Sequence, residues 1–159
     1  MKIKPKISED VYEVDLYTDL PLIELFRMRG YDHVNKRLNT DWFDDYLVKG
    51  EEEAFLKFLS FGEEISIIEA KRYLVQEDII GAGLRELAAF GADCPEIFKS
   101  AIQVFSLART SIKSIGFEEV VPVLFYSLEY GVFDTRPISD VIPRDAHVLI
   151  HAPPFSRWG

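Results

Sequence analysis

Residues 93–116 read DCPEIFKSAIQVFSLARTSIKSIG and contain the most regular hydrophobic pattern of the chain. Apolar residues recur there at intervals of three and four, which is the spacing of one face of an α-helix. Asp93 can cap the start of this helix, Pro95 suits its first turn, and Gly116 follows its end. The pattern predicts a long amphipathic helix and, with it, a mainly α protein. The apolar face of the helix consists of Phe98, Ala101, Phe105, Ala108, Ile112 and Ile115.

Further helices are predicted on the N-terminal side of this segment. The first begins at the capping residue Asp19, has Pro21 in its first turn and ends before Gly30. A break near Glu77 and Asp78 separates the last two. The predicted segments are 19–30, 41–50, 51–61, 63–75 and 76–90. In the segment 51–61, EEEAFLKFLSF, the inward face of the helix would consist of Ala54, Phe55, Phe58 and Leu59.

Residues 117–130 are also predicted to be helical, with Pro122 in the first turn, because a proline further along would break the helix. Glycine follows three of the predicted helices, at Gly62, Gly91 and Gly131, because glycine tolerates the left-handed conformation that ends a helix. The segment LAAFGAD around Gly91 resembles the end of the second helix of an ankyrin repeat. These glycines are 29 and 40 residues apart, whereas that family repeats about every 33 residues, so generic helical hairpins are predicted instead.

Two short strands are predicted near the ends of the chain. Residues 10–17, DVYEVDLY, alternate acids with apolar residues, and residues 146–151 are the best strand candidate in the proline-punctuated tail 132–159. An isolated strand cannot satisfy its backbone hydrogen bonds, so the two strands are expected to pair. The prediction is one domain over residues 1–159, in which packed helical hairpins (19–131) carry a small sheet made by the terminal strands.

The composition is that of a globular protein. The chain has 159 residues, of which 48% are hydrophobic, so it can bury a core without disulfides or a structural metal. Its apolar runs are much shorter than the roughly 20 residues of a membrane-spanning helix, and the start MKIKPKISED has no apolar signal core. The single cysteine, Cys94, cannot form an internal disulfide. We therefore expect no membrane association and predict a cytoplasmic location.

The charge of the chain is concentrated in one region. Residues 9–64 contain fifteen acids and six bases, so this segment carries the whole net charge of −9. It also contains ten of the 21 aromatic residues, which indicates a folded segment rather than a disordered acidic tail. A negative field repels nucleic-acid phosphate and attracts basic proteins. The charge therefore argues against direct nucleic-acid binding and favours a basic protein partner, although a solvated acidic face without a partner is an open alternative.

The most acidic and aromatic part of this region is the predicted contact surface. Tryptophan and tyrosine are common interface anchors, and acids around them can pair with arginine or lysine on a partner. The alternative is that Trp42 and Tyr46 face the core. The predicted partner-binding residues are Asp41, Trp42, Asp44, Asp45, Tyr46, Glu51, Glu52 and Glu53.

Other candidate sites are weaker. His147 and His151 form H-x-x-x-H, but in a strand four residues span about 13 Å, which is too far to share a metal ion. Gly81 and Gly83 match only two of the three glycines of a dinucleotide-binding loop, with Glu86 at the third position. No cofactor or metal is predicted.

Two reactive-residue candidates also remain weak. The cluster Asp41, Asp44 and Asp45 could serve as catalytic carboxylates, but it lacks the order of a calcium loop. The acidic neighbour Asp93 opposes activation of the Cys94 thiol.

The sequence thus predicts a protein-binding domain rather than an enzyme. The specific hypothesis is an inhibitor or immunity-type protein that masks a basic partner such as a nuclease toxin. The alternatives are a small enzyme or ligand-binding domain that uses His147, His151 or the aspartate cluster, and a homo-oligomer in which the 98–115 helix faces its own copy. The oligomeric state is left open.

Overall fold

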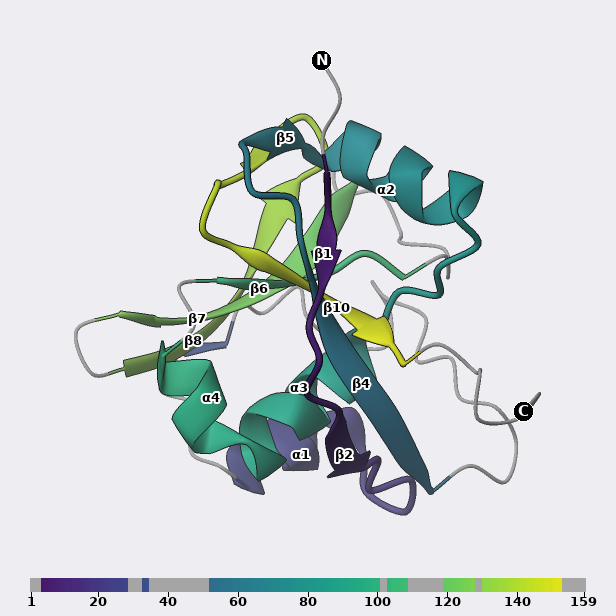
Figure 1. Ribbon diagram of the computed structural model, residues 1–159. Helices are drawn as coiled ribbons and strands as arrows, with labels where there is room; N and C mark the ends of the chain where they lie inside the picture. The colour runs from purple at the N-terminus through teal and green to yellow at the C-terminus, as the bar shows by residue number, and fades with distance from the viewer. Residues whose placement is uncertain are drawn as a thin grey trace, which may run out of the picture.

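The computed structural model describes residues 4–28, 33–34, 52–100, 103–108, 119–127 and 130–152, which are built around one eight-stranded sheet (Figure 1). Its strands are β1 (Lys6–Ile7), β2 (Tyr12–Asp15), β3 (His33–Val34), β4 (Glu53–Ser60), β6 (Val104–Ser106), β7 (Val120–Ser127), β8 (Tyr130–Pro137) and β10 (His147–His151). The strand order is β1-β4-β10-β6-β7-β8-β3, and β2 pairs with β4 beside β1. The sheet is mixed, because β10 runs parallel to β6 and β3 runs parallel to β8, while the other pairs are antiparallel.

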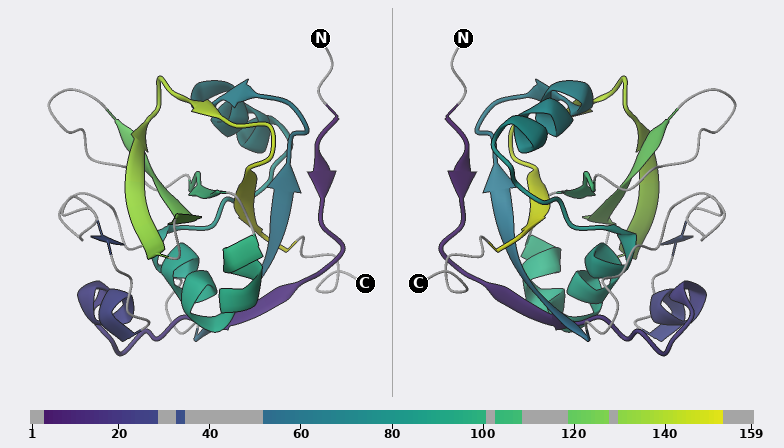
Figure 2. Two further views of the ribbon diagram at one scale, coloured as in Figure 1. Left: turned by 90° about the vertical axis from the view of Figure 1, so that its left-hand side faces the viewer. Right: turned by 90° about the vertical axis from the view of Figure 1, so that its right-hand side faces the viewer.

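Helices cover both faces of this sheet. The described helices are α1 (Leu22–Met28), α2 (Ile67–Gln76), α3 (Leu84–Asp93) and α4 (Pro95–Ser100), and a small second sheet pairs β5 (Ile65–Ser66) with β9 (Val141–Ile142). On one face Leu87 of α3 belongs to the same buried cluster as Leu56 of β4 and Phe133 of β8. On the other face Leu74 of α2 belongs to a second cluster with Val148 of β10. Figure 2 shows α2 and α3 at opposite ends of the curved sheet.

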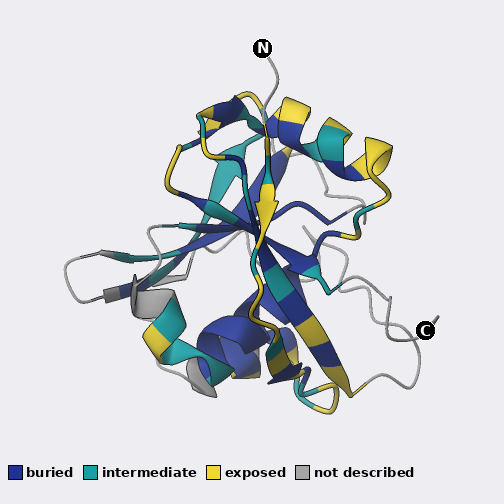
Figure 3. Ribbon diagram, in the orientation of Figure 1, coloured by how far each residue is buried: buried dark blue, intermediate teal, exposed yellow. Residues whose placement is uncertain are grey.

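The prediction of a mainly α protein made of helical hairpins is wrong, and β4 shows why. Burial alternates along the first half of this strand, as the bands in Figure 3 show. Ala54 and Phe58 point inward in either a helix or a strand, so they satisfied the helical pattern. The residues that decide between the two structures are Leu56, which is fully buried, and Phe55, which is 48% exposed.

The predicted helix at 117–130 is wrong as well, because β7 and the start of β8 occupy most of it. Val120 and Leu124 belong to the cluster on the α3 face, whereas Val121 and Val123 belong to the cluster on the α2 face. Burial on both faces produces a continuous apolar run without periodicity. Pro122 lies inside β7 opposite Thr135 of β8, just beyond the end of the register with β6 at Val123.

The predicted helix at 93–116 is correct only at its start. Helix α4 ends at Ser100, and β6 begins at Val104. Phe105, a member of the predicted helical face, lies in the α2-face cluster, while its neighbour Val104 lies in the α3-face cluster, as expected of a strand. Residues 109–118 lie outside the described part. The long helix that a homo-oligomer was expected to use is therefore interrupted by a sheet strand.

Several local predictions are confirmed. Strand β2 lies within residues 10–17, α1 lies within 19–30, and β10 lies within 146–151. The two terminal strands do not pair with each other, however, since β2 and β10 flank β4. The predicted helix ends at Gly91 and Gly131 are wrong, because these residues lie inside α3 and β8.

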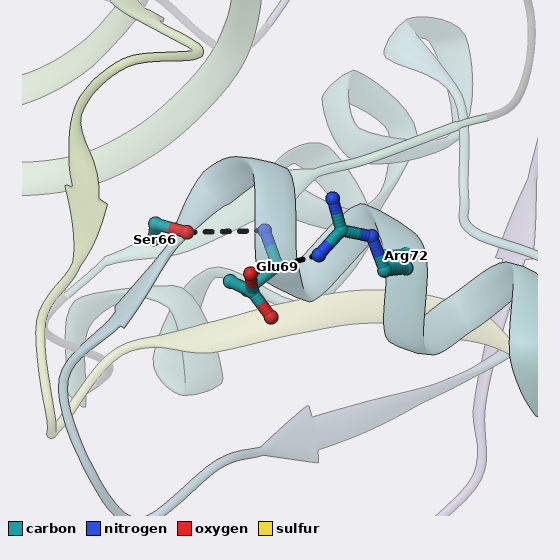
Figure 4. A network of polar contacts seen from close by, with 3 residues as sticks. All are labelled: Ser66, Glu69 and Arg72. Atoms are coloured by element: carbon teal, nitrogen blue, oxygen red, sulfur yellow. Dashed lines mark hydrogen bonds and ion pairs between the residues drawn. The ribbon is translucent and has the colours of Figure 1, made fainter.

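Helix α2 begins later than predicted because Ser66 caps it. The Ser66 hydroxyl accepts a hydrogen bond from the Glu69 backbone N–H (3.1 Å), and Arg72 then pairs with the Glu69 carboxylate at 2.8 Å (Figure 4). The break near residues 77 and 78 is confirmed, since Asp78 takes a left-handed conformation with φ of 55° after the helix ends. Among the described helices none is long and apolar enough to cross a membrane; α2 and α3 have ten residues each.

Candidate functional site

The outward side chains of β2 and of the start of β4 gather on one exposed part of the sheet. In the antiparallel register Asp15 lies opposite Glu53, and Glu13 lies opposite Phe55. Opposite residues of such a pair project to the same face, so these four side chains are neighbours. All four are exposed, while Val14 between the two acids of β2 is buried. We call Glu13, Asp15, Glu53 and Phe55 the acidic face.

The other carboxylates of the acidic face lie close enough to Glu53 to raise its pKa. The pKa of Glu53 is raised above its usual value, first by a hydrogen bond with the Glu13 side chain and then by the negative charge of Glu13. A small loss of hydration and the charges of Asp15 and Glu52 raise this pKa further. Like charges placed opposite each other destabilise a sheet. The acidic face therefore holds charge that a cation would stabilise.

Polar contacts with α3 hold the acidic end of β2 in place. Asp93, at the end of α3, accepts hydrogen bonds from the Asp15 backbone N–H (2.8 Å) and from the Tyr17 hydroxyl (2.5 Å). The donors of these two bonds lie 78 and 76 positions from Asp93 in the sequence, so no local sequence pattern predicts them. They fix the direction in which the strand leaves the sheet, while the Asp15 carboxylate itself accepts a hydrogen bond from the Tyr17 backbone N–H (2.7 Å).

Arg85 of α3 completes this anchor. Its guanidinium donates to the backbone carbonyls of Leu16 (3.3 Å) and Tyr17 (2.9 Å), and the residue is only 4% exposed. Tyr17 has a φ of 51°, a left-handed conformation that is unfavourable for a bulky side chain. The Arg85 contacts stabilise this conformation, because charged donors form strong hydrogen bonds with carbonyl oxygens.

The structure describes only part of the sequence-predicted contact surface. Six of its residues, Asp41, Trp42, Asp44, Asp45, Tyr46 and Glu51, lie outside the described residues. Glu52 and Glu53 are described, and both are exposed. Glu13 and Asp15 were missed as site residues. Their alternation with Val14 placed them on one face of a strand, but the partner strand β4 had been predicted as a helix.

The two histidines lie at the two ends of β10 and have different partners, as the predicted strand spacing requires. His147 Nδ1 lies 2.7 Å from the Ser60 hydroxyl, and its ring stacks on Phe58 with centroids 4.6 Å apart. His151 Nε2 lies 2.6 Å from Glu86 Oε2. Groups of three or more metal-ligating residues are absent from the described part of the chain.

The start of α3 is occupied by the protein's own carboxylate. Glu86 Oε1 accepts the Gly83 backbone N–H at 2.9 Å, and the side chain is almost completely buried. The small residue at Gly81 has a different reason, because an added Cβ would lie 2.8 Å from the Leu107 carbonyl oxygen. Gly81 therefore allows close packing against the chain after β6, and Gly83 lies at a helix start. The arrangement does not favour a dinucleotide phosphate here.

Cys94 follows α3 and is partly buried. The pKa of its thiol is raised, first by burial and then by the charge of Asp93. A raised thiol pKa lowers the thiolate fraction at neutral pH. The acidic neighbour thus has the effect expected from the sequence.

No protein-family model, curated protein or solved structure matches this chain.

Proposed function

We propose that this protein binds a basic protein through its acidic face. The observation that supports the proposal most strongly is the crowding of Glu13, Asp15 and Glu53 on one exposed part of the sheet, which raises the pKa of Glu53. A lysine or arginine from a partner would neutralise repulsion that the free protein has to tolerate. Relief of this repulsion would then contribute to the free energy of binding.

Phe55 supplies the apolar part of the proposed contact. Its ring is 48% exposed in the middle of the acids, on a strand whose alternate residues are buried. An aromatic ring beside carboxylates suits an arginine, since the guanidinium can stack on the ring and also donate to a carboxylate. The proposed partner therefore presents arginine-rich basic surface rather than an apolar groove.

The specific form of the proposal is an inhibitor or immunity-type protein that masks a basic partner such as a nuclease toxin. A cleft that binds phosphate is cationic, so an acidic surface competes for it and speeds encounter. The net charge of −9 favours the same kind of partner and argues against direct binding of nucleic acid. A cytoplasmic location remains a prediction that the single cysteine favours.

A titration with a synthetic peptide of alternating arginine and alanine tests the proposal. The peptide would be added to the ¹⁵N-labelled full-length protein at about 0.05 and 0.2 M salt, and backbone amide shifts would be followed by NMR. We expect the largest shifts at Glu13, Asp15, Glu53 and Phe55. We also expect weaker binding at the higher salt concentration, because exposed charges are screened.

A matched pair of triple variants separates the acidic face from general acidity. The variant Glu13→Gln, Asp15→Asn, Glu53→Gln should bind the peptide at least about tenfold more weakly than the wild type. The control Glu64→Gln, Glu77→Gln, Glu96→Gln removes the same charge from exposed positions elsewhere and should keep most of the affinity. Equal loss of affinity in both variants, or shifts spread evenly over the surface, would contradict the proposal.

A further inference from the structure

Ser60 and His147 form a hydroxyl–imidazole pair across the antiparallel strands β4 and β10. The register places Val148 opposite Leu59, so the next pair brings His147 opposite Ser60 on the same face of the sheet. Their side chains meet at 2.7 Å between the Ser60 Oγ and His147 Nδ1, and both residues are partly exposed. A nucleophile within hydrogen-bond reach of a base is the arrangement that activates serine hydroxyls.

Other residues fix the orientation of the imidazole. The ring lies nearly parallel to the Phe58 ring, at an angle of 11°, and the His147 backbone N–H donates to the Gln103 carbonyl at 2.9 Å. In the tautomer with its proton on Nε2, the Nδ1 lone pair accepts the Ser60 proton. The ring stacking and the backbone hydrogen bond thus keep His147 Nδ1 directed at the Ser60 hydroxyl.

Two charged groups act on this pair. Burial lowers the pKa of His147 below its usual 6.5, while the negative charge of Asp145 opposes part of this change. The ring is therefore neutral, and able to accept a proton, at pH 7. Lys6 of β1 lies opposite Ser60 on its other side and is exposed, whereas Val104, the register neighbour of His147 on β6, carries no charge. The order on this face is Lys6, Ser60, His147.

We propose that Ser60 is a nucleophile, with His147 as its general base, that accepts the acyl group of small esters with accessible carbonyl carbons. The Ser60 oxygen bonds to the carbonyl carbon as its proton moves to His147 Nδ1. The bond to the leaving oxygen then breaks, and the alcohol departs with the proton from the imidazolium. Water, deprotonated by His147, next attacks the acyl-serine, releases the carboxylic acid and restores the Ser60 hydroxyl. The Lys6 ammonium stabilises the negative charge that develops on the carbonyl oxygen.

This activity is independent of the acidic face, since the pair lies at the other end of β4 and shares no residue with it. It can therefore be tested separately from the binding proposal. A fluorophosphonate probe forms a bond between the serine oxygen and phosphorus with loss of fluoride, so it reports an activated hydroxyl by mass. Labelling of the exposed Ser139 in the same chain provides an internal reference rate.

The experiment treats the folded full-length protein with the probe and locates the label by peptide mass spectrometry. We expect the label at Ser60, formed at least about tenfold faster than at Ser139, and its loss in Ser60→Ala. His147→Gln should slow labelling at Ser60 by about tenfold or more, with circular dichroism confirming the fold. We also expect p-nitrophenyl acetate to transfer an acetyl group to Ser60.

A second variant tests the role of the base without touching the pair. Because Asp145 raises the pKa of His147, the exposed-site change Asp145→Asn should move the pH midpoint of Ser60 labelling to lower pH. Labelling at pH 8 should stay unchanged, since His147 is neutral there in both proteins. Absence of label at Ser60, equal labelling of Ser60 and Ser139, or a pH midpoint unchanged in Asp145→Asn would overturn the proposal.

Discussion

The two ends of β4 carry different chemistry on one continuous strand. At the end near Glu53 the neighbouring strand β2 supplies further carboxylates, and Phe55 is exposed between them. At the end near Ser60 the neighbours are Lys6 on one side and His147 on the other. The difference arises from the strands that pair with β4 as well as from the residues of β4 itself. The surroundings of a β4 side chain thus depend on residues far away in the sequence.

The two ends of β4 also differ in whether their polar groups are in favourable contact. The acidic end contains like charges that raise the pKa of Glu53, so it gains from a cation supplied by another molecule. At the other end the Ser60 hydroxyl already has its hydrogen-bond partner within the protein. The proposed partner binding belongs to the first end, and the proposed acyl transfer belongs to the second.

The largest expected effect comes from breaking β4 itself. Leu56→Ala should lower the free energy of unfolding by about 2–5 kcal/mol, because the side chain is fully buried in the α3-face cluster. Phe55→Ala, one residue away, should change it by less than about 1 kcal/mol, because Phe55 is exposed. Urea unfolding of both variants measures the difference. A larger loss for Phe55→Ala would restore the helical interpretation of this segment.

A smaller loss of stability is expected when only the contacts that anchor the end of β2 are removed. Arg85→Ala leaves the Leu16 and Tyr17 carbonyls without their charged donor and should cost about 3 kcal/mol. Hydrogen exchange should quicken in β2 while the amides of β10 keep their relative protection. Arg72→Ala is the matched control, since its ion pair with Glu69 is exposed and contributes at most about 0.5 kcal/mol. Equal effects of the two variants would show that Arg85 does not anchor β2.

The smallest expected effect is the change in stability caused by ionisation of Glu53. A pKa raised in the folded state contributes stability below the unfolded pKa, and this contribution is lost as pH rises through the folded pKa. Ionised Glu53 therefore disfavours the native state at neutral pH. Glu53→Gln should raise the melting temperature slightly at pH 7, and this gain should disappear well below the usual glutamate pKa of 4.5, where Glu53 is protonated in both the folded and the unfolded state. A lower melting temperature at pH 7 would indicate that Glu53 is stabilising.

Local signals were sufficient where an element depends on its own residues. Asp19 and Pro21 predicted a helix start within three residues of where α1 begins, at Leu22, and the alternation in 10–17 predicted β2. The same reasoning failed at β4, because Ala54 and Phe58 fit a period of two and a period of 3.6 equally well. It failed at β7 because burial on both faces removed the alternation that identifies a strand.

The candidate sites could not be derived from the sequence because they are made by long-range pairing. Ser60 and His147 are 87 positions apart, and Asp15 meets Asp93 across 78 positions. The sequence identified residues 9–64 as acidic, but it did not single out Glu13 and Asp15 as part of a shared surface. Assigning them to a surface required the β2–β4 register, which only the fold supplies.

The most direct test of the account is the NMR titration of the Glu53 side-chain carboxyl, with and without the arginine–alanine peptide at saturating concentration. In the free protein Glu53 should titrate above the usual value of about 4.5, and Glu13→Gln should return its pKa toward that value. Peptide binding should lower the Glu53 pKa, since a bound cation favours the carboxylate. A Glu53 pKa that is ordinary in the free protein, or that does not change with saturating peptide, would contradict the proposal that the acidic face binds a basic partner.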